Sequence, residues 1–343
     1  MHITDLISTD DLIAELAAGT IKCSVSPDGL LHIYNYAPQA AYAGLWTPAQ
    51  RVCRGLITET DGTIIARAFD KFFNLGEQPE TRLDALPAGP MLAMDKIDGS
   101  LGVIFWHAGQ PHVATRGSFT SPQAQWATAW LRANVDQDEL RRWTLGYSTL
   151  LVEIIIPVSR IVVDYGAGND GLVLLAERDT RTGDYTAPGA LRNLGDILGL
   201  RVAEARMIDR LDDLLDDAAT RVGIEGWVVA YPNGLRVKIK TDEYRTLHRL
   251  MMSCTVPYVR RLLEEYGEAI LSDYLPKLPA LLRGDVLRVA NTLMLRYYKV
   301  KASAEAAFIA LSKLEDRGTF ARAVTATGRK DSAVLFHLWD MEH

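Results

Sequence analysis

Cysteine is scarce in this sequence of 343 residues, and the few cysteines form no recognisable metal or disulfide pattern. The three cysteines are far apart and no Cys-x-x-Cys pair occurs among Cys23, Cys53 and Cys254. We therefore expect neither a disulfide framework nor a structural zinc site, and a reducing cytosol fits better. The acidic segment 1–20 lacks the basic and apolar parts of a signal peptide. No run of roughly 18 apolar residues predicts a membrane span.

Several common catalytic motifs are also absent. There is no G-x-x-x-x-G-K-[ST] phosphate loop, no H-E-x-x-H zinc motif and no G-x-S-x-G nucleophile elbow. The glycines of GSLGVIFWHAG precede no predicted helix, which argues against a dinucleotide fingerprint. The formal net charge of −6 gives no overall attraction to nucleic acid, although a local basic groove remains compatible with it.

The pattern of apolar residues predicts an α+β domain followed by an all-α domain. Three hairpins are expected, at RVCRGLIT-ETDG-TIIARAF, SLGVIFWH-AGQ-PHVATRG and GWVVAYPNGLRVKIK. TLLVEIIIP, RIVVDY and GLVLLAERD are rich in β-branched residues, and helices are expected over 9–18 and 121–135. Strand patterns stop after about residue 242 and helical patterns follow. We place the domains at 1–248 and 249–343.

Charged residues accompany most of the predicted strands of the first domain. Lys96 follows an apolar run in AMDKIDGSLG, and in isolation this is a common surface turn. Glu153 interrupts the run LLVEIIIP, which also fits a solvated sheet face. Lys238 and Lys240 alternate with apolar residues and share one face of a strand, as lysines protecting an edge strand would.

These residues gain meaning as a set. Arg54, Lys71, Lys96, Lys238 and Lys240 are cations that require an anion, while Glu153 and Glu225 offer hard oxygen ligands for a sugar hydroxyl or Mg²⁺. A polyphosphate with its metal would satisfy both groups. Only a neutral lysine amine can attack as a nucleophile, and neighbouring positive charge favours that form. The set therefore predicts a covalent lysine nucleophile in a phosphate site.

The order and spacing of these segments resemble the covalent nucleotidyltransferases, the superfamily of ATP-dependent ligases and capping enzymes. Within it the sequence is most similar to the phage-type RNA ligase 1 family. The resemblance covers roughly residues 30–250. The sequence motifs that carry it are CRGLI, DKFFNLGE, KIDGSLG, ATRGS, VEIIIPVSRIVV, EGWVV and VKIKTDEYRTLH. The resemblance implies a nucleotidyltransferase domain of antiparallel sheets with flanking helices, plus an all-α C-terminal domain.

The resemblance also implies a role for each matching residue. Lys96 would attack the α-phosphate of ATP and hold AMP, with Lys238 and Lys240 at the α-phosphate. Glu225 would act with Mg²⁺ or Mn²⁺, and Glu153 would hold the ribose. Asp98 would either shape the turn or touch the ligand, and nothing in the sequence decides which. The other matching positions of the ATP site are Tyr36, Arg54, Lys71, Phe73, Gly99, Arg116 (where the family has lysine) and Gly226.

The family's reaction joins a 5′-phosphate to a 3′-hydroxyl of RNA through lysyl-AMP and RNA-adenylate intermediates. We therefore expect an RNA repair ligase, with tRNA as one candidate substrate, acting as a monomer in the cytoplasm of a bacterial or phage-infected cell. The helical domain is a candidate RNA-specificity module, in which YVRR, LRYYKVK and TGRK either contact phosphates or form solvated helix faces. The alternatives are an ATP-dependent DNA ligase, a capping-type nucleotidyltransferase, or an inactive RNA-end-binding module.

Overall fold

The computed structural model describes residues 1–144, 147–156, 162–166, 168–253, 255–278, 280–314 and 316–342. Cys254 and residues 157–161, which belong to the segment VEIIIPVSRIVV, therefore lie outside the described residues. The chain divides into two compact units, Met1–His248 and Arg249–His343, and each is described by itself. No helix within the described ranges is long and apolar enough to cross a membrane.

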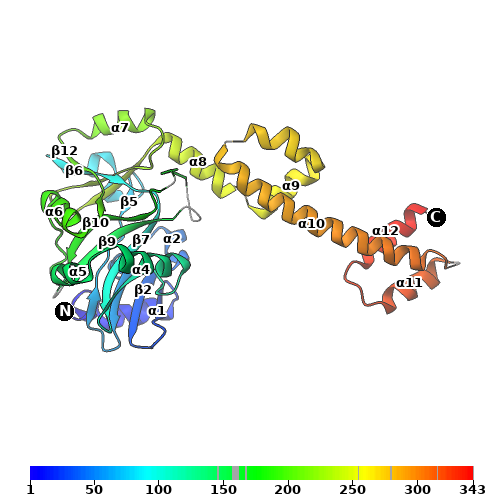
Figure 1. Ribbon diagram of the computed structural model, residues 1–343, viewed down its shortest axis with the longest axis horizontal. Coiled ribbons are helices and arrows are strands. Elements are labelled where there is room, and N and C mark those ends of the chain that lie inside the picture. The colour runs from blue at the N-terminus through cyan, green and yellow to red at the C-terminus, as the bar shows by residue number, and fades with distance from the viewer. Residues whose placement is uncertain are drawn as a thin grey trace. The chain divides into compact units, whose positions relative to one another are not determined.

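The described residues of the first unit form three β-sheets (Figure 1). A four-stranded sheet has the order β1 Ile21–Val25, β2 Leu31–Tyr36, β3 Arg54–Glu59 and β4 Ile64–Ala66. The central sheet has the order β11 Arg201–Val202, β10 Gly171–Asp179, β9 Ser148–Ile155, β7 Ser100–His107 and β8 Gln110–Thr115. The third sheet has the order β12 Ala205–Ile208, β6 Met91–Lys96, β13 Gly226–Ala230, β14 Arg236–Lys240 and β5 Phe73–Asn74.

Most sheet neighbours are antiparallel, as predicted, and the three expected hairpins are confirmed as β3–β4, β7–β8 and β13–β14. The first turns at Asp61–Gly62, where Gly62 has a φ of 91° that favours glycine. The segment RIVVDY differs from its β-branched neighbours, because its described residues Val162–Tyr165 form no strand. The backbone N–H groups of Val162 and Val163 instead donate hydrogen bonds to the side chain of Asp98.

The central sheet is buried on both faces, which explains its long apolar runs. On one face Leu150, Val152 and Ile154 of β9 join a core with helices α4 Pro122–Asn134 and α6 Pro188–Leu198. On the other face Leu151 packs with Ile33 and Ile57 of the four-stranded sheet. The third sheet packs its own apolar face on helix α7 Leu211–Thr220.

The predicted helices over 9–18 and 121–135 are confirmed as α1 Thr9–Ala17 and α4, and each begins at a serine cap. Ser8 and Ser121 accept hydrogen bonds from the backbone of Asp11 and Ala124, the usual chemistry of a helix start. The remaining α-helices among the described residues of this unit are α2 Pro38–Ala43, α3 Pro48–Val52, α5 Gln137–Thr144 and α8 Asp242–Ser253, whose last residues belong to the second unit.

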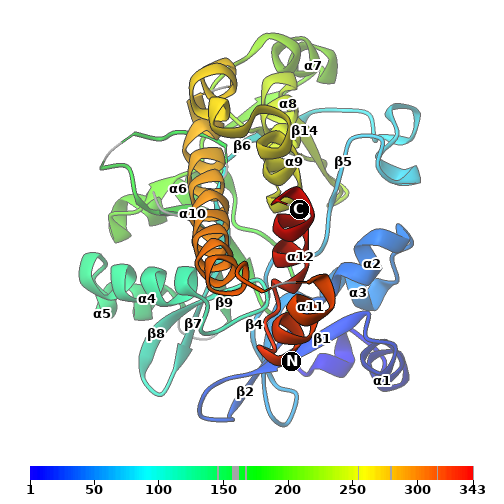
Figure 2. The same ribbon diagram turned by 90° about the vertical axis from the view of Figure 1, so that its right-hand side faces the viewer.

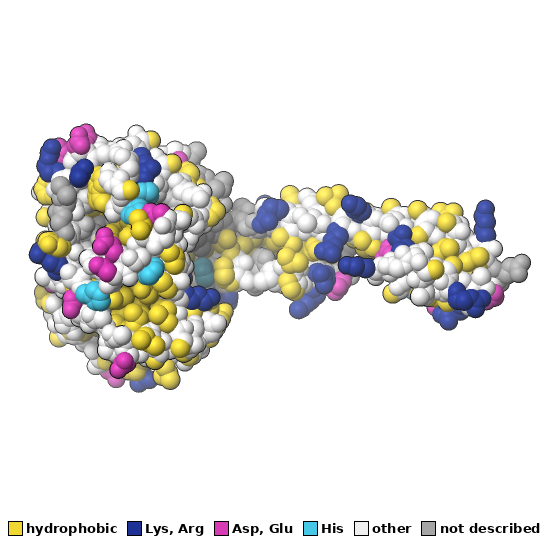
Figure 3. Space-filling view, turned by 90° about the horizontal axis from the view of Figure 1, so that it is seen from below, with side chains coloured by type: hydrophobic (Ala, Val, Ile, Leu, Met, Phe, Trp, Pro, Cys, Tyr) yellow, Lys and Arg dark blue, Asp and Glu magenta, His cyan; other side chains and the backbone are white. Residues whose placement is uncertain are grey.

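The second unit is helical, as the sequence predicts. Its long helix α10 Ala280–Leu311 packs at one end on α9 Val256–Tyr266 and at the other on α11 Arg317–Ala326 and α12 Ser332–Glu342 (Figure 2). Two separate cores result, one around Val259 and Val286 and one around Phe320 and Trp339. The space-filling view shows Lys and Arg side chains spread along this unit between hydrophobic ones (Figure 3).

Candidate active site

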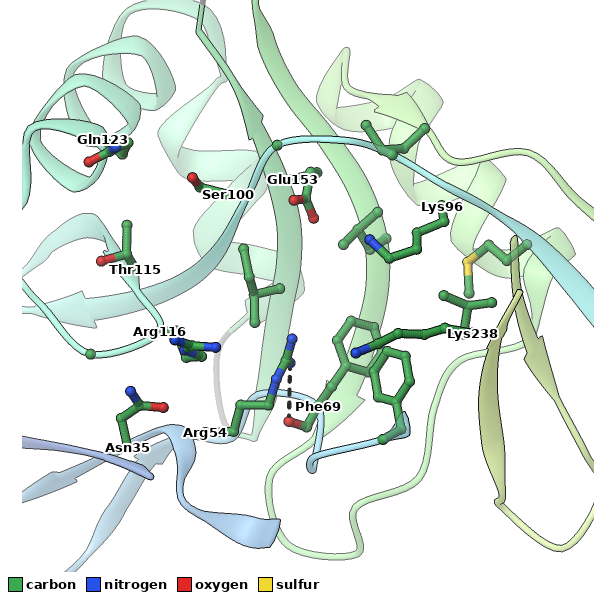
Figure 4. A pocket seen from close by; sticks show the side chains of 18 of the residues that line it. Asn35, Arg54, Phe69, Lys96, Ser100, Thr115, Arg116, Gln123, Glu153 and Lys238 are labelled. Carbon is green, nitrogen blue, oxygen red and sulfur yellow. Dashed lines mark hydrogen bonds between the residues drawn. The ribbon is translucent and has the colours of Figure 1, made fainter. Parts of the chain in front are cut away.

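Lys96 lies at the junction of two sheets. It ends β6 of the third sheet, and after three residues the chain enters β7 of the central sheet at Ser100. A cavity of about 600 Å³ opens beside this junction. Figure 4 shows the side chains of Lys96, Lys238 and Arg54 pointing into the same space, with Glu153 beside them. The junction therefore places the predicted nucleophile at the wall of a cavity large enough for a nucleotide.

The strand register brings Glu225 and two lysines together. Gly226 on β13 pairs with Lys96 of β6 on one side and with Lys240 of β14 on the other. A side chain at Gly226 would place its Cβ 2.0 Å from the Ile239 carbonyl oxygen, so this position requires glycine. Glu225, which is buried, bridges the lysines: Lys96 Nζ lies 2.6 Å from Oε2 and Lys240 Nζ lies 3.0 Å from Oε1.

Asp98 shapes the turn after the lysine. Its buried carboxylate accepts hydrogen bonds from the backbone N–H groups of Val162 and Val163 at 2.7 and 2.8 Å and from the Tyr244 hydroxyl at 2.8 Å. Its own backbone N–H donates to the Tyr165 hydroxyl at 2.6 Å. Asp98 does not line the cavity, and these contacts favour the turn-shaping alternative that the sequence left open.

Glu153 enters the cavity from the middle of β9. The neighbouring backbone explains Gly99, because a Cβ there would lie 2.6 Å from the Ile154 carbonyl oxygen. Burial raises the pKa of Glu153 to about 8, and repulsion from Glu225 adds to this effect, against the attraction of Lys96. A carboxyl held partly protonated near neutral pH can donate as well as accept a hydrogen bond, which suits contact with a sugar hydroxyl.

This pKa predicts a pH dependence that Glu153→Gln removes. The folded chain holds the Glu153 proton more tightly than a carboxyl with the ordinary pKa of 4.5, so the stabilisation is complete below that pH and is lost as pH rises through about 8. Between these limits the wild type should lose stability relative to the variant by up to about 1.4 kcal/mol per pH unit. Urea unfolding of both proteins without nucleotide, across this range, measures the difference. Parallel stability curves would contradict it.

Apart from Lys96, the cations that line the cavity form no ion pair with an acidic side chain of the described residues. Burial lowers the pKa of Lys238 well below its usual range, and Lys71, Arg54 and Lys96 add to this effect. Burial likewise lowers the pKa of Lys71 and of Arg54. Neither Lys71 nor Lys238 forms an ion pair with any described residue. The Arg54 guanidinium donates to the Phe69 carbonyl oxygen at 3.4 Å. Uncompensated positive charge of this kind is suited to an anionic ligand.

Aromatic rings hold these cations in place. The Lys71 amine lies over Trp46 and Phe73, 4.9 and 4.6 Å from the ring centroids. Trp46 also packs edge-on against Tyr36, whose hydroxyl accepts a hydrogen bond from Arg116 at 2.7 Å. Cation–π contacts of this kind stabilise buried cations without neutralising their charge.

Six of the predicted site residues line the cavity, namely Arg54, Lys96, Gly99, Arg116, Glu153 and Lys238. The other seven do not belong to the lining of this cavity. Glu225, Gly226, Lys240 and Asp98 support the lysine junction, while Tyr36, Lys71 and Phe73 form the aromatic cluster with Trp46.

Sequence reasoning missed three residues of this region. Trp46 carries no motif that could have identified it. Phe72, whose ring lies 4.7 Å from the Lys238 amine, is adjacent to the predicted Phe73 in DKFFN. Tyr244, which binds Asp98 and lies 4.7 Å from the Lys240 amine, occurs in the segment TDEYRTLH. The segments DKFFN and TDEYRTLH were both assigned to the site from the sequence, but only the contacts in the structure identify Phe72 and Tyr244 as the side chains involved.

A divalent metal would find two carboxylates here. In the part of the chain that the structure describes, no group of three or more His, Cys, Asp or Glu side chains forms a protein-only metal cage. Glu225 lies close enough to Glu153 to raise its pKa, so the two carboxylates could bind one metal ion together. Mg²⁺ is commonly held by one or two carboxylates together with substrate phosphates and water. This donor set fits a metal that arrives with a nucleotide.

The fold is similar to that of ligases of known structure. An archaeal ATP-dependent RNA ligase aligns with 95% of this chain and 89% of its own at a TM-score of 0.56 and 14% identity. A putative ATP-dependent DNA ligase from Aquifex aeolicus aligns with 98% of this chain and 88% of its own at a TM-score of 0.53 and 15% identity. At these identities the likeness concerns the fold alone.

A family model described as RNA ligase matches residues 52–244, and the chain belongs to this family. RNA ligase 1 of bacteriophage TS2126 is 31% identical over 254 residues, which are 70% of this chain and 61% of the relative. A putative RNA ligase of Thermovibrio ammonificans is 30% identical over 214 residues, 59% of this chain and 54% of the relative. The chain thus spans between half and two thirds of the length of these relatives.

Proposed function

We propose that this chain is an ATP-dependent RNA ligase whose nucleophile is Lys96. The observation that carries the proposal is the position of the Lys96 amine, which Glu225 holds at 2.6 Å beside a cavity of about 600 Å³. The same cavity contains cations without acidic partners and so suits a polyphosphate. Membership of the RNA ligase family supports this assignment.

In the first step the Lys96 amine attacks the α-phosphorus of ATP. A P–N bond forms, the P–O bond to pyrophosphate breaks, and the amine loses a proton. The Glu225 carboxylate, 2.6 Å from Nζ, is placed to accept that proton. Lys238 and Arg54 face the developing negative charge from within the cavity and stabilise it.

The next two steps use the same phosphorus chemistry. A 5′-phosphate oxygen of RNA attacks the phosphorus of lysyl-AMP: a P–O bond forms, the P–N bond breaks, and the departing Lys96 nitrogen takes back a proton from the Glu225 carboxyl. A 3′-hydroxyl then attacks the 5′-phosphate phosphorus, loses its proton and expels AMP, and the phosphodiester is formed. Mg²⁺ or Mn²⁺ bound by Glu225 would supply charge neutralisation to the phosphates. The proposed substrates are RNA ends with a 5′-phosphate and a 3′-hydroxyl, including cleaved tRNA.

The helical unit is proposed to act as an RNA-specificity module, which its exposed basic residues support. Its sequence segments YVRR and LRYYKVK lie in α9 and α10, and TGRK follows α11. Solvated helix faces remain the alternative. We further propose that the protein acts as a monomer in the cytoplasm of a bacterial or phage-infected cell.

Label transfer separates this function from its alternatives. The purified chain is incubated with Mg²⁺ or Mn²⁺ and with ATP, GTP or NAD labelled at the α-phosphate, and is then offered RNA or DNA ends. We expect label from ATP on the protein and sealing of RNA. Strong GMP transfer would indicate a capping-type enzyme, preferential DNA sealing would indicate a DNA ligase, and no transfer from any nucleotide would indicate an inactive RNA-end-binding module.

A further inference from the structure

A second cavity of about 560 Å³ adjoins the first across the ring of Phe72, which lines both. Its walls come from α3, from the segment around Lys71, from the loop after β10 and from the β13–β14 hairpin. The polar side chains that face it include Arg51, Lys71, Arg178, Tyr231 and Arg236. None of these except Lys71 belongs to the predicted nucleotide site.

Positive charge exceeds negative charge in this second cavity. Asp70 is bound by both Nη atoms of Arg178, at 3.0 and 2.9 Å, and Glu80 is bound by Arg51 at 2.7 Å. The third carboxylate, Asp184, is exposed to solvent. Lys71 and Arg236 form no ion pair with a described residue. Two cations of the cavity wall are therefore left without an acidic partner among the described residues.

Two buried donors of the cavity also lack partners. Tyr231 is only 4% exposed, and its hydroxyl makes no hydrogen bond to a described residue. The Arg236 Nε is likewise buried and makes no hydrogen bond to a described residue. The Arg236 guanidinium stacks on Tyr185, 3.7 Å from the ring centroid, and this contact fixes its plane. Buried polar groups are almost always hydrogen-bonded, so two unsatisfied donors on residues that line one cavity point to a ligand that accepts hydrogen bonds.

We propose that this second cavity binds a phosphate group of the RNA strand through Tyr231, Arg236 and Lys71. The inference rests on the proposed function, which makes RNA the substrate. An anion with several acceptor oxygens satisfies a phenol, a planar guanidinium and an ammonium together. Phe72 lines both cavities, so the proposed phosphate site adjoins the cavity in which Lys96 lies. Free pyrophosphate has the same chemistry and is the other source to be tested.

Tyr231→Phe is the first test, because it removes one oxygen and keeps the ring. The hydroxyl makes no hydrogen bond within the part of the chain that the structure describes, so the thermal midpoint should not fall. Binding of a fluorescent 5′-phosphorylated single-stranded RNA, measured by anisotropy without ATP, should weaken about tenfold. The dependence of this binding on salt should not change, because the phenol is neutral.

Arg236→Gln is the second test, and here the salt dependence should change. Loss of one phosphate contact lowers the slope of log K against log salt by about 0.7 for a single strand. The matched control is Arg181→Gln, since Arg181 also stacks on a tyrosine, 3.5 Å from the Tyr147 ring, but lines neither cavity. The control should bind RNA with the wild-type affinity and slope.

The outcomes distinguish an RNA phosphate from free pyrophosphate as the ligand, and they test the phosphate site separately from the ligase function. Wild-type RNA affinity in both variants overturns the RNA assignment, and if calorimetric binding of pyrophosphate is also unchanged, no phosphate binds there. Weakened pyrophosphate binding with unchanged RNA affinity assigns the site to the free anion instead. The RNA measurement needs no catalysis, so a wild-type protein that forms no lysyl-AMP refutes the ligase proposal separately.

Discussion

Lys96→Ala should abolish the attachment of AMP to the protein while the chain stays folded. The amine is the only protein atom that bonds to the α-phosphorus in the proposed mechanism, so no residual covalent protein–AMP intermediate is expected. Folding should survive because Glu225 keeps the second lysine, Lys240, at 3.0 Å. Transfer of label from α-labelled ATP to protein, measured beside the circular dichroism spectrum and the thermal midpoint, checks both parts.

The matched control for this substitution is Lys22→Ala. Lys22 is an exposed lysine on β1, and its removal should change neither labelling nor the thermal midpoint. A Lys96→Ala protein that folds and still becomes labelled would place the nucleophile on another residue. Supplying RNA that is already adenylated should restore sealing in part, because the later steps do not use the Lys96 amine as a nucleophile.

Glu225→Gln should have the second-largest effect, because one buried carboxylate holds both lysines. Glu225 is 3% exposed, and its two oxygens bind Lys96 and Lys240 separately. The amide has the same shape but no charge, and it cannot take the proton that Lys96 releases. We expect lysyl-AMP formation to slow by about 100-fold or more, the scale on which a single lost electrostatic contact acts in a transition state.

Stability should fall as well, since the substitution leaves two partly buried lysines without a counter-charge. The control is Glu139→Gln, which breaks the surface pair of Glu139 with Arg142 and should change stability by less than about 1 kcal/mol. Single-turnover labelling and urea unfolding of the two variants measure both effects. A Glu225→Gln protein that labels at the wild-type rate would show that this carboxylate neither positions nor deprotonates the lysine.

Much of the fold could be predicted because local signals agreed with the final structure. Asp61–Gly62 and Asn233–Gly234 lie at the turns of hairpins β3–β4 and β13–β14. Ser8 and Ser121 mark the starts of two helices. Sheet order could not be predicted in the same way, because β13 lies between β6 and β14, and the pairing of β6 with β13 joins residues about 130 positions apart. Long-range pairing of this kind leaves no mark in a local pattern.

In the site, too, local patterns predicted some residues correctly, whereas the features that depend on long-range contacts were not predicted. Period two correctly placed Lys238 and Lys240 on one strand, β14. It could not show that Lys238 lines the cavity beside Lys96, whereas Lys240 does not line it and binds Glu225. The role of Asp98 was undecided in the sequence because its partners Val162, Val163 and Tyr244 are more than 60 residues away. Trp46 and the second cavity were missed because their contacts arise only from tertiary packing.

The most direct test of the central claim is the location of the covalent intermediate. The chain is incubated with ATP and Mg²⁺, digested under conditions that preserve a phosphoramidate, and analysed by peptide mass spectrometry. We predict that the mass of one AMP is added to the peptide that contains Lys96, that addition of pyrophosphate removes it, and that Lys96→Ala lacks it. AMP on a different residue, or no adduct from an active folded protein, would contradict the assignment of Lys96 as the nucleophile.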